Sequence, residues 1–247
     1  FYDAVWIAST AINLANSHID GGTVATISGG VIKATAGTSS ISNTTSFSND
    51  GTVEVIGAGV ELDLINVALS NTAAGTVEAI SGGLLVLNAS TINNGGSVAT
   101  VSNGVIEATV GPSQIIGAHI NNAGTLEAIS GGALFISSTT IVNSGVLQAN
   151  AATLTIDHQS SLTNTGSLAA INDGTLNIQS DVSGSGTATI SSGATLELGG
   201  ADAQTVTFSG AGTLQLDGFA NFTGTVTGLA DGDVIDLANT VVISASY

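Results

Sequence analysis

The sequence has 247 residues, with one Lys or Arg against 18 Asp and Glu, which gives a formal net charge of −17. Binding to nucleic acid or to anionic lipid through charge needs clustered basic residues, and Lys33 alone does not supply them. The absence of cysteine excludes disulfides and thiolate metal sites, and a hydrophobic content of 43% excludes a solvated disordered coil.

Residues 1–19 do not share the pattern of the following chain, and we expect them to form an N-terminal cap or a leading strand. The chain starts at Phe1 without a basic leader segment, so we expect it to be a piece of a longer protein. It contains no run of about 18 uncharged apolar residues, which predicts no insertion into a membrane.

Residues 20–185 repeat one pattern: a small polar residue, an apolar residue, any residue, Asn, any residue and Gly. The glycines that close the pattern stand at positions 51, 75, 96, 124, 145 and 166, with a looser copy at 75. Most of their separations are equal, so the basic unit has about 21 residues, and insertions lengthen some copies. The longest separation lies between Gly96 and Gly124. A longer stretch of sequence similarity relates the segment beginning at Gly22 to the segment beginning at Gly96.

Apolar residues alternate with polar ones inside each unit, and a period of two indicates strands rather than helices. Three short strands per unit cannot bury an apolar face alone, but stacked units bury one together. The sequence therefore predicts an all-β parallel β-solenoid, right-handed, with about three strands in each ~21-residue coil. At about 4.8 Å per coil, roughly ten to twelve coils form a rod.

The recurring asparagines have a predicted structural role. Asn tolerates a left-handed turn conformation, and a stacked amide can bond to the coils above and below it. We expect one ladder of stacked amides at a single corner of the rod, formed by Asn49, Asn94, Asn122, Asn143 and Asn164.

The repeat loosens from about residue 186, and residues 186–247 are predicted to be irregular C-terminal coils or a cap. The densest group of carboxylates lies there, at Asp231, Asp233 and Asp236. Hard oxygen ligands at a turn suit Ca²⁺, the one cofactor that the sequence suggests. An ordinary turn stabilised by Asp side chains is the alternative.

Three glutamates occupy the same slot, three residues after the closing Gly: Glu54, Glu78 and Glu127. We expect all three to point outward on one sheet, with Glu54 and Glu78 about 5 Å apart, near the separation of a retaining glycosidase pair. The equivalent slots hold Ala99, Gln148 and Ala169, which is typical of a tolerant solvated face. No serine-hydrolase spacing, zinc motif or phosphate loop accompanies the glutamates.

Units such as Asn122-Ala-Gly-Thr-Leu-Glu-Ala-Ile-Ser-Gly-Gly-Ala-Leu, and the stretch from Phe222 to Leu237, resemble the β-solenoid repeats of large secreted bacterial surface proteins. Autotransporter passengers and giant RTX-type adhesins contain such arrays. The resemblance implies an extracellular, elongated stalk or adhesive module and carries over no catalytic residue. The calcium-binding nonapeptide of RTX arrays is absent from this sequence.

These observations predict a non-enzymatic, extracellular or cell-surface segment that serves as a stalk, adhesin or matrix component. Its expected partners are a glycan or protein of a host or cell surface, or further copies of itself joined end to end through unpaired strand edges. A polysaccharide-active or glycan-binding β-helix is the alternative, and the outward glutamates are its motivation.

Overall fold

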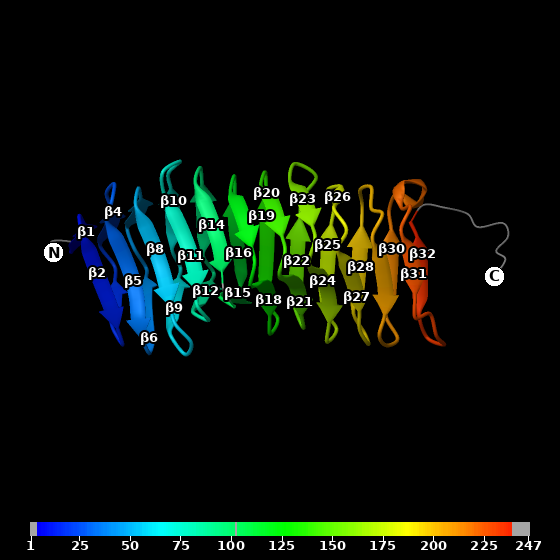
Figure 1. Ribbon diagram of the computed structural model, residues 1–247. Helices are drawn as coiled ribbons and strands as arrows, with labels where there is room; N and C mark the ends of the chain where they lie inside the picture. Colours follow the sequence, from blue (N-terminus) through cyan, green and yellow to red (C-terminus); the bar gives the residue numbers. More distant parts are fainter. Residues whose placement is uncertain (1–3, 102, 239–247) are drawn as a thin grey trace.

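The computed structural model describes residues 4–101 and 103–238, without the side chain of Asn94; the remaining parts of the two predicted terminal segments lie outside these residues. The chain winds through parallel sheets into a rod with its two ends far apart (Figure 1). The described residues contain no α-helix and one 3-10 turn, η1 (Phe219–Asn221). The predicted all-β parallel solenoid is confirmed.

As far as β27, each coil contributes one strand to each of three sheets, here named A, B and C. Sheet A contains β1 (Val5–Ala8), β4 (Thr23–Thr26), β7 (Ser46–Asn49), β10 (Ala68–Asn71), β13 (Thr91–Asn94), β16 (Pro112–Ile116), β19 (Ala133–Ser137), β22 (Thr153–Ile156), β25 (Thr175–Ile178), β28 (Thr195–Leu198), β30 (Thr213–Leu216) and β32 (Val234–Leu237). Sheet B contains β2 (Ala11–Ala15), β5 (Val31–Ala36), β8 (Thr52–Ile56), β11 (Thr76–Ile80), β14 (Ser97–Val101), β17 (His119–Asn122), β20 (Thr140–Asn143), β23 (Ser161–Asn164) and β26 (Val182–Ser183). Sheet C contains β3 (His18–Asp20), β6 (Thr38–Ser42), β9 (Glu61–Ile65), β12 (Leu84–Asn88), β15 (Val105–Val110), β18 (Thr125–Ile129), β21 (Val146–Asn150), β24 (Ser167–Ile171), β27 (Thr187–Ile190), β29 (Thr205–Phe208) and β31 (Thr225–Thr227).

Alternation along each strand separates a closed core from an outer surface. In β9, for example, Leu62 and Leu64 are fully buried, whereas Glu61 and Asp63 between them point outward. Equivalent residues of successive coils lie directly opposite one another, so the buried side chains stack into one continuous apolar column. Burial of stacked aliphatic groups in this way is the main stabilising contribution to such a rod.

The corners of the rod bring backbone very close to backbone. At Gly145, an added Cβ would lie 2.1 Å from the carbonyl oxygen of Gly124 in the preceding coil. Only a residue without a side chain fits there, because the clashing atom belongs to a rigid backbone. This steric requirement explains why the closing Gly recurs in the sequence pattern.

The repeat changes sheet halfway along the rod. Its Asn-bearing strands are β7, β10 and β13 in sheet A, but β17, β20 and β23 in sheet B. The long segment between Gly96 and Gly124 contains one strand more than the basic unit, so every later copy is displaced by one face. The longer stretch of sequence similarity crosses sheets for the same reason, since it relates β4 of sheet A to β14 of sheet B.

Both ends of the described chain extend the same architecture. Residues Val5–Asp20 give one strand to each sheet, so the N-terminal segment forms a coil of its own. Sheets A and C continue to β32 and β31, whereas sheet B stops at β26. Beyond β26, isolated bridges join Val182 to Asp202 and Asp202 to Phe222 on face B.

Candidate functional site

The predicted amide ladder exists, but as two ladders on two corners rather than one. In the first, Thr26 Oγ1 donates to Asn49 Oδ1, and Asn49 Nδ2 donates to Asn71 Oδ1 at 2.6 Å. This ladder follows the ends of the sheet A strands. Asn71 belongs to the loosest copy of the repeat and was not among the predicted ladder residues.

The second ladder follows the ends of the sheet B strands. Thr100 Oγ1 donates to Asn122 Oδ1, and two amide–amide bonds of 2.6 Å then join Asn122 to Asn143 and Asn143 to Asn164. Asn164 Nδ2 donates to Gln204 Oε1 at 2.8 Å, which ends the series. The expectation of a single corner is wrong because the extra strand between the two halves rotates the repeat by one face. These buried amides bond to one another and to the rod's own side chains.

Of the three glutamates expected on one sheet, two form a pair on sheet B, Glu54 and Glu78. Glu54 and Glu78 lie directly opposite each other on β8 and β11 of sheet B, with Lys33 opposite Glu54 on the other side. Partial burial, and then the charge of Glu54, raises the pKa of Glu78. Glu127 lies in sheet C, not sheet B, because it follows the shift of the repeat.

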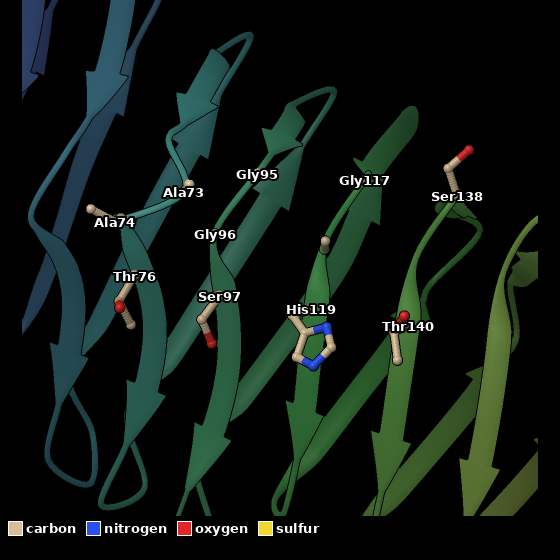
Figure 2. Close-up of a pocket in the computed structure, with 12 residues that line it drawn as sticks. Ala73, Ala74, Thr76, Gly95, Gly96, Ser97, Gly117, His119, Ser138 and Thr140 are labelled. Atoms are coloured by element: carbon tan, nitrogen blue, oxygen red, sulfur yellow. The ribbon is translucent and has the colours of Figure 1, made fainter.

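A groove of about 480 Å³ lies at the corner between sheets A and B, beside the glutamate pair but not lined by it. Its floor is the bare backbone of Gly75, Gly95, Gly96 and Gly117. Figure 2 shows Thr76, Ser97, His119 and Thr140 in a row on four successive strands along one side of the groove. The row offers three hydroxyls and one imidazole at intervals of one coil, about 4.8 Å.

His119 differs from the other two histidines. His18 Nδ1 is 2.8 Å from Ser40 Oγ, and His158 Nδ1 is 3.1 Å from the carbonyl oxygen of Gln179. No such bond is found for the exposed ring of His119 within the described residues, so its nitrogens are free to meet a ligand in the groove. In the sequence repeat His119 occupies the slot of Thr91 and Thr140, which is typical of a tolerated corner position.

Of the three C-terminal aspartates, Asp231 is exposed in the turn before β32, and the other two have different neighbours. Asp233 accepts backbone N–H groups of Gly212 at 3.2 Å and Ala230 at 2.7 Å, which closes the turn before β32. Asp236 lies opposite Gln215 on the outer face of sheet A. Across the described ranges, no three His, Cys, Asp or Glu side chains come close enough together to hold a metal ion.

A second acidic surface was not predicted from the sequence. Glu61 and Asp63 on β9, Glu107 on β15 and Glu127 on β18 all point outward from sheet C. Burial raises the pKa of Asp63 to about 7, together with a hydrogen bond to Glu61 and the charges of Glu61 and Glu107. Burial and the charges of Glu127 and Glu61 likewise raise the pKa of Glu107 to about 7. The pair on β9 and the glutamates on β15 and β18 are far apart in sequence, and only the stacking of coils brings them together.

The fold and surfaces define a three-sheet parallel β-solenoid. No protein-family model matches the chain, and no curated protein matches it. Comparison with solved structures finds the crystal structure of a TibC-catalysed, hyper-glycosylated TibA55-350 fragment, at 16% identity over 94% of this chain and 100% of that chain. The TM-score is 0.31, so the two backbones do not superimpose closely. Within the described residues, no helix has the length and apolar character needed to cross a membrane.

Proposed function

We propose that this chain is a rigid, non-enzymatic segment of a secreted bacterial surface protein, acting outside the cell as a stalk, adhesin or matrix component. The observation that supports the proposal is the uninterrupted apolar core through all three sheets. A rod in which each coil contacts mainly its two neighbours can be lengthened coil by coil at a constant cross-section and presents a long regular surface. Its many small hydroxyl side chains and strong negative charge keep that surface soluble.

The location is tested with antibodies raised against the purified rod. Intact cells of the source bacterium are labelled and compared with lysed cells, with a cytosolic protein as the control. Labelling of intact cells is expected, and antigen detected only after lysis would overturn the proposal.

Attachment assays with the same cells distinguish a stalk from an adhesin. In-frame removal of residues 20–185 should reduce attachment to host cells or to an abiotic surface in either case. An excess of the purified rod competes with attachment only if the rod itself carries the binding surface. Reduced attachment without competition identifies a stalk.

The groove supports a second candidate, the binding of a neutral glycan. One coil is about as long as one pyranose unit, so a linear oligosaccharide lying parallel to the rod would meet one polar side chain of the row per sugar. The groove lining contains no carboxylate and neither Lys nor Arg. With a net charge of −17 on the chain, an uncharged sugar suits it better than an acidic one.

Calorimetric titration with cellohexaose, maltohexaose and hexagalacturonate tests the glycan hypothesis. We expect binding of a neutral hexasaccharide, weakened by His119→Ala and unchanged by His158→Ala, which removes a histidine outside the groove. Undiminished binding of that hexasaccharide by H119A, or no binding by the wild type, would discard this candidate.

A further inference from the structure

Four consecutive strands of sheet C carry a surface in which acidic and apolar residues are arranged in a defined order. We call it the sheet C strip, and it consists of Glu61, Asp63, Leu84, Val86, Val105, Glu107 and Glu127. The strip runs along the rod from β9 through β12 and β15 to β18. All seven side chains point outward because they alternate with the buried core residues of the same strands.

The apolar part lies between the carboxylates. Leu84 and Val86 on β12 are flanked by Glu61 and Asp63 on one side, and Val105 and Glu107 follow on the other. Val86 is only 6% exposed although it occupies an outward position, so its neighbours cover it, whereas Leu84 and Val105 are partly exposed. An aliphatic chain can therefore rest on this strip with acidic groups within reach at both ends.

The carboxylates of the strip lack partners of opposite charge. Lys33, the one Lys or Arg of the chain, lies in sheet B, opposite Glu54. The polar neighbours of the strip are uncharged: Thr38 Oγ1 donates to Glu61, and Gln148 Nε2 donates to Glu127 at 2.6 Å. Asp63 Oδ1 is buried and accepts no hydrogen bond. Because this oxygen is covered, a partner does not meet it directly; what favours a basic partner is the set of four carboxylates without a counter-charge.

We propose that the sheet C strip binds an extended segment of a partner protein through its lysine or arginine side chains. The aliphatic stem of such a side chain packs on Leu84 and Val105, and its cationic head donates to Asp63 and Glu107. A second copy of this chain does not fit, because one Lys33 per copy cannot neutralise four carboxylates. The partner is therefore a different, basic protein.

Hexa-L-lysine is a direct probe, and its Nε-acetylated form is the control that keeps the stems but loses the charges. Any chain with a charge of −17 attracts a polycation to some extent, so the decisive comparison is between two variants with equal net charge. D63N/E107Q removes two charges from the strip, and D173N/D181N removes two exposed charges elsewhere. Affinity is measured by calorimetry at pH 8, with circular dichroism as the check on folding.

We expect the affinity for hexa-L-lysine to fall about tenfold or more in D63N/E107Q, because each charge-assisted hydrogen bond is strong. It should change less than about twofold in D173N/D181N, where only the long-range attraction is reduced. Leu84→Ser should weaken binding with every charge in place. Equal losses in the two double variants, or equal binding of the acetylated peptide, would overturn the proposal.

The pH dependence gives an independent readout. Lowering the pH from 8 to 5 protonates Asp63 and Glu107, whose pKa values are about 7, and should weaken binding in the wild type. Glu61 and Glu127 are the other titratable groups of the strip. D63N/E107Q should lose most of this dependence, and an unchanged dependence would contradict the assignment. This binding does not depend on where the rod lies in the cell, so its failure would leave the proposed surface role intact.

Discussion

Replacing Asn143 by Ala tests the idea that the amide ladder stabilises the rod. Asn143 is fully buried in the middle of the second ladder, between Asn122 and Asn164. Its amide accepts one bond of 2.6 Å from Asn122 and donates one of 2.6 Å to Asn164. It also donates to the backbone carbonyl of Ser167 at 3.1 Å. Alanine removes all of these bonds.

At about 1 kcal/mol for each buried hydrogen bond, the substitution should cost about 3 kcal/mol. For a chain of this size, about 3 kcal/mol corresponds to a fall in Tm of roughly 6–12 °C. The neighbouring Asn121 is the matched control. It is exposed, and the same change at Asn121 should shift Tm by no more than about 2 °C.

Thermal unfolding followed by circular dichroism, with urea unfolding as a second measurement, gives both values. The comparison between N143A and N121A does not require a two-state transition, because both variants share the same architecture. Equal shifts in Tm for the two variants would refute the stabilising role of the ladder.

Three further predictions follow from other parts of the rod. The pKa values of Asp63 and Glu107, raised to about 7, mean that the native state binds more protons than the unfolded state between about pH 4 and 7. The free energy of unfolding should therefore fall as pH rises through this window, giving a lower Tm at pH 8 than at pH 5. Glu107→Gln should raise Tm at pH 8 and reduce the difference; a higher wild-type Tm at pH 8 would contradict this. At Gly145 an added methyl would lie 2.1 Å from a backbone oxygen, whereas at Gly95 the nearest atom lies at 3.4 Å, so G145A should unfold about 1–3 kcal/mol more easily than G95A in a urea titration. Both oxygens of Asp233 already accept backbone N–H groups, so they are not free to bind Ca²⁺. We therefore expect the same Tm in the presence of Ca²⁺ and of a chelator. A higher Tm with Ca²⁺ would support a calcium site at the C-terminal aspartates.

The regular repeat unit made the local structure readable from the sequence. A period of two along Leu85 and Leu87, or Leu154 and Ile156, identifies strands, because alternate side chains of a strand point to opposite faces. The recurring Asn before a recurring Gly identified the corners. Stacking of similar units then requires parallel sheets and one continuous core, so the fold class follows from the repeat alone.

The sheet to which each copy of the repeat belongs depends on the number of strands between the copies. The repeat pattern does not encode that number. Asn49 and Asn143, or Glu54 and Glu127, occupy the same slot of the unit but belong to different sheets. The insertion between Gly96 and Gly124 forms one further strand and turns every later copy by one face. Counting spacings reveals the insertion, but only the folded coil shows that it adds a strand rather than a longer loop.

Sequence alone thus determined the all-β class, the coil length and the apolar core. Tertiary structure alone decided which side chains meet: the two ladders, the groove beside His119, and the sheet C strip that joins Asp63 to Glu107. These groups lie on the same or nearby coils in space, although a full turn of the rod or more separates them along the chain. Their proximity depends on the register between coils, which is set by hydrogen bonds and packing across the whole rod.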